Sequence, residues 1–191
     1  MIFTIDTREG EKLDLVNPSP QQIHIQDVAL ALSRICRFAG HSTEFYSVAQ
    51  HSLRVSKIVE VLGYPELRSL ALHHDSHEAY MGDISSPLKQ LLDDRGQVSE
   101  LRDLSARLDQ AIRSAFGINN PTPEQRAIIK KADLIALRIE AKAMMKDTFA
   151  TPSIAEPLAA HQLPTISLYL EPQAAYALFL ERHRELGLPW N

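Results

Sequence analysis

The stretch HHDSHEAYMGDI, residues 73–84, is the most informative part of this 191-residue chain. It places His74 directly before Asp75, inside a segment whose apolar residues recur at helical spacing. A helix over about residues 65–80 would put His74 and Glu78 one turn apart on one face, with Asp75 roughly 100° round from His74. The stretch therefore predicts a helical framework that carries polar side chains inward.

The same periodicity extends to both sides of this stretch and predicts an all-α fold. Gly40 and Gly63 end the first two helices, and Thr122 begins a later one as an N-cap, with Pro123 in the first turn and Gln125 at the capping-box position. Only residues 1–4 and 166–169 look strand-like. We expect helices over about 25–38, 44–62 and 65–80, through Leu101, Leu104, Leu108, Ile112 and Ala115, from Thr122 through Ile129, Asp133, Ala136 and Glu140, and over about 172–186.

Length and composition predict one helical domain, residues 1–191. A hydrophobic share of 45% is enough for a core, and no internal repeat divides the chain. Proline-marked joints fall near residues 17–20, 119–123 and 150–164. No second domain is needed to explain the sequence.

Charge and cysteine content exclude several classes of protein. The net charge of -4 and the pI near 6.1 argue against binding of polymeric nucleic acid, which favours a basic face. Cys36 is the single cysteine, which excludes an intrachain disulfide and a cysteine-built zinc site. The charged N-terminus is unlike a signal peptide, and no apolar run is long enough to span a membrane. We expect a soluble, cytoplasmic protein.

Four side chains form a candidate metal site: His51, His74, Asp75 and Asp133. Two imidazoles and two carboxylates suit a divalent transition ion, which makes water a usable nucleophile near neutral pH. A histidine on an apolar stripe, such as His51, is more often a satisfied core residue. Asp75 and Asp133, however, fall within apolar helical patterns, where a carboxylate needs a cation or donors to offset its burial. We interpret His24, His41, His73 and His77 as surface residues or neighbours of the site.

The spaced set of motifs resembles the HD-domain metal phosphohydrolases, in particular the small bacterial 5′-deoxynucleotidases and their prophage-encoded relatives. The resemblance covers most of the chain. It includes IHIQDVALALSRICRFAGH (23–41), EFYSVAQHS (44–52), HHDSHEAYMGDISSPLK (73–89) and KADLIALRIE (131–140).

The resemblance implies a role for each matching residue. His51, His74, Asp75 and Asp133 would bind manganese, cobalt, zinc or another divalent ion, and Glu78 would act on the proton as general base or acid. Arg37 would bind the phosphate of the substrate, since guanidinium forks match phosphate oxygens. Asp83 would bind the sugar 3′-hydroxyl, since a carboxylate accepts from a hydroxyl.

Two departures from the family pattern bear on specificity. Phe38 follows Arg37 where some close relatives carry tryptophan, and His77 stands where a small residue is usual. A ring beside the sugar can exclude a 2′-hydroxyl, so a preference for deoxyribose is expected while the base stays open. Lys89 is either a second cation over the phosphates or a solvated surface lysine, and Lys130 or Lys131 could also reach them.

The resemblance predicts hydrolysis of a deoxynucleoside monophosphate to deoxynucleoside and phosphate. Phage relatives instead cleave a dNTP, with dATP as a target, to nucleoside and triphosphate, and the sequence does not choose between them. A non-catalytic nucleotide-binding sensor on the same scaffold is a further alternative, disfavoured by the retained Glu78. The apolar run YALFL, 176–180, could belong to a homodimer interface as well as to the core.

Overall fold

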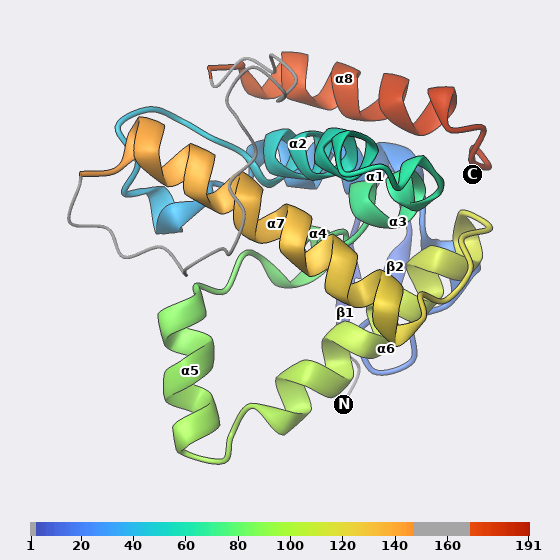
Figure 1. The fold of residues 1–191 in the computed structure, drawn as a ribbon. Helices are drawn as coiled ribbons and strands as arrows, with labels where there is room; N and C mark the ends of the chain where they lie inside the picture. The colour runs from blue at the N-terminus through green and yellow to red at the C-terminus, as the bar shows by residue number, and fades with distance from the viewer. Residues whose placement is uncertain (1–2, 147–168) are drawn as a thin grey trace.

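The computed structural model describes residues 3–146 and 169–191, and over these residues the fold is mainly helical (Figure 1), which confirms the all-α prediction. A short antiparallel hairpin precedes the helices, with Thr4 opposite Asp14. The elements are β1 (Thr4–Asp6), β2 (Lys12–Asp14), α1 (Ile25–Arg34), α2 (Val48–Val61), α3 (Arg68–Leu72), α4 (Glu78–Met81), α5 (Ser86–Asp94), α6 (Ser99–Ala115), α7 (Pro123–Met144) and α8 (Pro172–Glu185), with single 3-10 turns at Pro20–Gln22, Phe38–Gly40 and Pro65–Leu67. In the part of the chain that the structure describes, every helix is too short or too polar to cross a lipid bilayer.

Helix α2 is the centre of the fold, and most of its residues are buried. It packs against α1, α3, α7 and α8. The Ser47 hydroxyl caps its N-terminus by accepting from the backbone N–H of Gln50. In return, the backbone N–H of Ser47 donates to the side-chain oxygen of Gln50. One apolar cluster joins the first half of α2 to α1, α6 and α8, and another joins its second half to α3 and α7. Polar side chains placed on α2 are therefore held by packing on every side.

The first helix is shorter than predicted, which changes the setting of Arg37. Helix α1 ends at Arg34, and Ile35 is already extended. Cys36 pairs with Ser47 in an isolated bridge, and the N–H of Arg37 donates to the carbonyl of Tyr46 at 2.9 Å. Backbone pairing with the segment before α2 thus replaces the last helical turn. Arg37 therefore lies in a loop and not at the end of a helix.

The predicted helix over residues 65–80 is interrupted where the HHDSH motif begins. Helix α3 ends at Leu72, and residues 73–77 form successive turns before α4. Hydrogen bonds of the i to i+3 kind close these turns, including those from Ser76 N–H to His73 and from Glu78 N–H to Asp75. Within these turns Asp75 Oδ2 lies 3.1 Å from His74 Nε2. The two side chains therefore converge, although adjacent residues of a regular helix point about 100° apart.

His73 is buried, so of its two predicted settings, at the surface or as a neighbour of the site, the surface setting is wrong. Its Nδ1 lies 2.9 Å from Ser76 Oγ, and its Nε2 lies 3.0 Å from Nδ1 of His183 on α8. His183 Nε2 in turn lies 2.9 Å from the carbonyl of Pro189. The rings of Phe116 and Phe179 contact His73 as well. This chain of contacts joins the HHDSH turns to the C-terminal segment.

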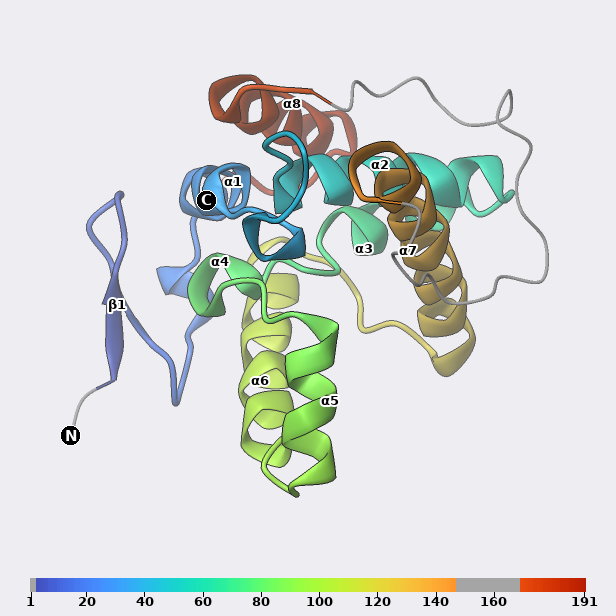
Figure 2. The same cartoon turned by 90° about the vertical axis from the view of Figure 1, so that its left-hand side faces the viewer.

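Helices α5 and α6 extend away from the layer formed by α1, α2 and α8, as both views show (Figures 1 and 2). Helix α5 was not predicted, and none of its residues is buried. Helix α6 buries Leu108, Ile112 and Ala115 as predicted. The loop between α4 and α5 therefore leads from the buried motif to an exposed helix within a few residues.

Several smaller expectations can now be compared with the structure. Strand β1 lies slightly later than the predicted residues 1–4, and its partner β2 was missed. The capping box at Thr122 is confirmed, and α8 ends one residue before the predicted limit.

Residues 166–168 of the second expected strand lie outside the described residues. In YALFL, Phe179 is fully buried and Leu178 is exposed, so the run contributes to the core. The single-domain and homodimer expectations stay predictions.

Candidate metal centre

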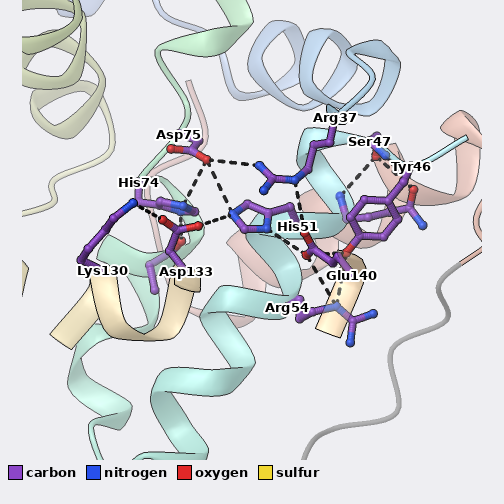
Figure 3. A network of polar contacts seen from close by, with 12 residues as sticks. Arg37, Tyr46, Ser47, His51, Arg54, His74, Asp75, Lys130, Asp133 and Glu140 are labelled. Atoms are coloured by element: carbon purple, nitrogen blue, oxygen red, sulfur yellow. Dashed lines mark hydrogen bonds and ion pairs between the residues drawn. The ribbon is translucent and has the colours of Figure 1, made fainter. Parts of the chain in front are cut away.

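The four side chains predicted as metal ligands converge at one point, although they come from three separate elements. His51 is on α2, His74 and Asp75 are in the turns after α3, and Asp133 is on α7. One ligand atom each from His51, His74 and Asp133 lies within 4.8 Å of the others. Asp75 is not part of this group of three, but it lies beside it, because its Oδ2 is 3.1 Å from His74 Nε2 and 3.7 Å from His51 Nε2 (Figure 3).

Both histidines present Nε2 to this cluster because their Nδ1 atoms are engaged elsewhere. His51 Nδ1 lies 2.9 Å from a carboxylate oxygen of Glu140, and His74 Nδ1 lies 2.8 Å from the carbonyl of Ala71. Carboxylate and carbonyl oxygens only accept, so each Nδ1 carries the N–H. A neutral ring then has its lone pair on Nε2, which is the arrangement found in histidines that bind metals.

The chemistry of this donor set fits a divalent cation. The Nε2 atoms of His51 and His74 are buried and have no hydrogen-bond partner of good geometry among the described residues. Two imidazole nitrogens and two carboxylates match the ligands of zinc, manganese or cobalt. The role of these four residues as ligands stays a prediction, which the geometry supports.

The charge around the cluster shifts the pKa values of its members. Burial alone would lower the pKa of His74, but the neighbouring Asp75 carboxylate outweighs burial and raises it to about 9. Burial would raise the pKa of Asp133, yet its contact with His51 lowers it. In the metal-free protein a proton on an imidazole thus takes the place that a cation would fill, and the two compete for the same nitrogen lone pairs.

Glu140 is a functional candidate that the sequence analysis did not identify. It is fully buried on α7, two turns after Asp133. Its Oε1 contacts His51 Nδ1 at 2.9 Å and accepts from the Tyr46 hydroxyl at 2.9 Å, while Oε2 lies 3.3 Å from Arg37 Nε. Burial would raise its pKa, but the charges of His51 and Arg37 lower it to about 2. The seven-residue spacing from Asp133, on one helical face, is the sequence signal that could have found it.

Arg37 lies between the cluster and Glu140. Its NH1 is 4.0 Å from Asp75 Oδ2, and only about a tenth of its side chain is exposed. Burial acts to lower its pKa, but the carboxylates of Glu140 and Asp75 outweigh burial and raise it. Arg37 therefore keeps its charge, one nitrogen is anchored on Glu140, and its other nitrogens reach towards the ligand atoms.

Glu78 is buried beside the cluster and lacks a partner for its Oε2 among the described residues. Burial raises its pKa to about 9, and the negative charges of Asp75 and Asp83 add to this rise. Arg37 and Lys89 act in the opposite direction. In the metal-free protein this raised pKa favours the protonated carboxyl group at neutral pH, which is the form that a general acid needs.

The remaining predicted residues lie around Glu78 and Arg37. Asp83, half-buried after Gly82, is close enough for its charge to act on both. Lys89 on α5 is half-buried and acts on Glu78, which favours its interpretation as part of the site. Phe38 has its ring centroid 5.8 Å from Arg37 Cζ, and its φ of 55° places it in the left-handed region, which is uncommon for a bulky residue.

His77, the other departure noted in the motif, lies next to α6. Its Nδ1 is 3.0 Å from Asp109 Oδ1, so it is held away from the ligand cluster. His24 lies 3.7 Å from Glu11, and His41 is exposed. These three residues are not brought to the candidate ligands.

Comparisons with known proteins give relatives that match between 61% and 96% of the chain. The uncharacterised Escherichia coli protein YfdR is 36% identical over 183 residues, which are 96% of this chain and 95% of that protein. An uncharacterised protein of Rhodobacter capsulatus is 38% identical over 140 residues, which are 70% of this chain and 68% of that protein. A dATP triphosphohydrolase of Acinetobacter phage SH-Ab 15497 is 30% identical over 136 residues, which are 61% of this chain and 65% of the phage protein.

No family model matches the chain. The relatives from E. coli and R. capsulatus both combine an identity above 30% with coverage of more than two thirds of their length. The chain therefore belongs to the same family as YfdR of Escherichia coli and its Rhodobacter capsulatus relative.

Proposed function

We propose that the protein is a metal-dependent phosphohydrolase of the HD type, acting on the 5′-phosphate of deoxyribonucleotides. The observation that carries this proposal is the convergence of His51 Nε2, His74 Nε2, Asp75 and Asp133 beside the buried Glu78. A divalent ion held there would supply Lewis acidity, which activates water and offsets phosphoryl charge. The similarity to a phage dATP triphosphohydrolase supports a phosphohydrolase.

The residues around the cluster suit the other tasks of such a reaction. Arg37 is charged, anchored by Glu140 and free to bond phosphate oxygens with its outer nitrogens. Glu78 in its protonated form donates to the leaving 5′-oxygen as the bond from phosphorus to that oxygen breaks. Water attacks phosphorus as this bond breaks, and the proton that the water releases restores Glu78, so that a monophosphate gives deoxynucleoside and phosphate.

Asp83 and Phe38 would contact the sugar of the substrate. A carboxylate accepts a hydrogen bond from a 3′-hydroxyl, and a ring packed beside the sugar leaves little room for a 2′-hydroxyl. The charge of Asp83 acts on both Arg37 and Glu78, and this supports a role for Asp83 beside them in the site.

The second candidate is a dNTP triphosphohydrolase, which would break the bond between the 5′-oxygen and the α-phosphorus and release triphosphate. The phage relative favours it, since that protein acts on dATP. The same residues serve both reactions, so the two candidates differ in how many phosphates the site accepts.

Product identification tests the proposal. Metal-replete protein, loaded separately with manganese, cobalt and zinc, is incubated with the four dNMPs, the four dNTPs and the matching ribonucleotides, and products are separated by chromatography. Orthophosphate from dNMPs supports the nucleotidase, and tripolyphosphate from a dNTP supports the second candidate. Nucleotide binding without turnover under all three metals would refute hydrolysis and indicate a sensor.

A further inference from the structure

A cavity of about 250 Å³ opens beside the candidate metal centre, between the turns after α3, helix α6 and the start of α7. His74, Asp75 and Asp133 form part of its wall, so the cavity reaches the predicted ligand atoms. Arg37, Phe38 and Asp83 are not among its lining residues. It is thus a space next to the ligand cluster that the roles assigned above leave unused.

Three basic side chains line this cavity. Arg126 and Lys130 are one turn apart on α7, so they share a face, and both are exposed. Lys130 Nζ donates to Asp133 Oδ2 at 2.7 Å, which places a positive charge directly beside a predicted ligand (Figure 3). Arg113 faces the same space from α6.

The two arginines are held close to each other. Arg113 is half-buried and oriented by its Nε, which donates to Asn120 at 3.0 Å, while its NH1 lies 3.8 Å from Asp109. Burial lowers the pKa of Arg113, and the charge of Arg126 lowers it further, against the effect of Asp109. Like charges fixed near one another are unfavourable unless an anion lies between them. The geometry therefore favours an anionic occupant.

Charge balance in the cavity leads to the same conclusion. Its acidic residues are Asp75, Asp109 and Asp133. A cation in the candidate metal centre would offset the charges of Asp75 and Asp133. Asp109 already contacts His77 and Arg113. With the centre filled, the cavity is electropositive, and its wall is continuous with the point at which a phosphate would react.

We propose that this cavity binds the phosphate groups of the substrate beyond the one at the metal centre, so that the preferred substrate is a deoxynucleoside polyphosphate. This inference rests on the proposed function and deepens it, because it selects the second candidate over the monophosphatase. Arg113, Arg126 and Lys130 are the residues that contact these phosphates. The apolar side chains of Leu70 and Ile129 form part of the cavity wall.

Binding of inorganic phosphates tests the cavity without relying on turnover. Manganese-loaded protein is titrated calorimetrically with orthophosphate, pyrophosphate and tripolyphosphate, with manganese matched in cell and syringe so that chelation cancels. We expect tripolyphosphate to bind about tenfold more tightly than orthophosphate, because it adds charge-assisted contacts. The Arg126→Gln variant should lower the affinity for tripolyphosphate about fivefold and that for orthophosphate much less.

Arg107→Gln is the matched control, because Arg107 is an exposed arginine on α6 that does not line the cavity. Arg126 is also exposed, so neither change should affect folding. Equal affinities for orthophosphate and tripolyphosphate would overturn the inference. So would equal effects of the two substitutions, or deoxyadenosine binding that Arg126→Gln weakens more than it weakens tripolyphosphate binding.

The two proposals fail in different ways. If tripolyphosphate binds through Arg126 but no nucleotide is hydrolysed with any of the three metals, the proposed function is wrong and the anion cavity stands. If a dNMP or dNTP is hydrolysed but Arg126→Gln leaves tripolyphosphate binding unchanged, the proposed function stands and the cavity has been assigned wrongly.

Discussion

The two sides of His51 differ in how their charges are satisfied. On one side, Glu140 is fully buried and contacts the Tyr46 hydroxyl, Arg37 and His51 Nδ1 (Figure 3). On the other side, Asp133 faces a cavity whose cations are largely exposed. A satisfied buried network holds one geometry, whereas exposed charges stay available to a ligand. The comparison separates the buried residues that position His51 from the exposed residues that are available to bind a substrate.

The largest effect is expected from removal of a predicted ligand. His74→Ala or Asp133→Ala should abolish metal binding and activity together, because each removes one of the four predicted donors. Metal content after gel filtration, measured by mass spectrometry, checks this. The control is His41→Ala, which removes an exposed histidine away from the cluster. Full metal content in both ligand variants would show that the cluster is not the metal site.

The next effect concerns Glu78, which lies beside the cluster without being a ligand. Glu78→Gln should keep the metal and lower kcat by about 10²- to 10⁴-fold, since an amide cannot donate the proton. Metal content and steady-state kinetics are measured on the same sample. Glu66→Gln, at an exposed position, is the control. Loss of metal in Glu78→Gln would instead make Glu78 a ligand.

Substitution of Glu140 tests whether the buried side positions His51. Glu140→Gln should weaken metal binding about 10- to 100-fold, as loss of an outer partner of a ligating histidine does. Calorimetric titration of the metal-free protein with manganese gives the dissociation constant. An unchanged constant would mean that His51 is oriented by packing alone, and the contrast between the two sides would lose its basis.

Acid stability sharpens the same contrast. The pKa of Glu140 is lowered from 4.5 to about 2, so its folded-state interactions stabilise the protein above pH 4.5. This contribution is lost as the pH falls from 4.5 towards 2. Glu140→Gln should flatten the pH dependence of the free energy of unfolding of metal-free protein in this window. Urea unfolding at several pH values measures it, with the exposed Glu181→Gln as the control.

The smallest effect is expected at Lys89, a half-buried residue of α5 that does not line the cavity. Its charge lowers the pKa of Glu78, so Lys89→Gln should raise that pKa. A general acid is active while protonated, and the alkaline limit of the rate profile should therefore move to higher pH. Rates measured from pH 6 to 10 test this, with the exposed Lys142→Gln as control. A shift to lower pH would contradict the assigned direction.

Helical periodicity predicted most elements of the fold, because the apolar stripes on α2, α6 and α7 are the faces that the core buries. It did not predict the break after Leu72, since the turns there are fixed by contacts of His73 with a residue 110 positions away. Nor did it predict the end of α1 at Arg34, which depends on backbone pairing with Ser47. Periodicity reports which face is buried and carries no information on distant partners.

The ligand set followed from residue chemistry, because a carboxylate on an apolar stripe needs a partner. Glu140 meets the same criterion and was overlooked, since its partners Tyr46 and Arg37 lie in loops whose position no periodicity reveals. Arg113 and Arg126 were beyond sequence reasoning altogether. Their proximity arises from the angle at which α6 and α7 enter the fold.

The contact between His73 and His183 has a consequence for the order of events during synthesis. The turns that carry His74 and Asp75 rest on a ring from α8, which the ribosome makes about a hundred residues later. Until that helix has emerged and docked, the HHDSH segment lacks its support, and contacts between distant residues form late. A nascent chain in which all four candidate ligands have left the ribosome should thus bind metal poorly. Tight metal binding should begin only after α8 has been made and has packed against the turns.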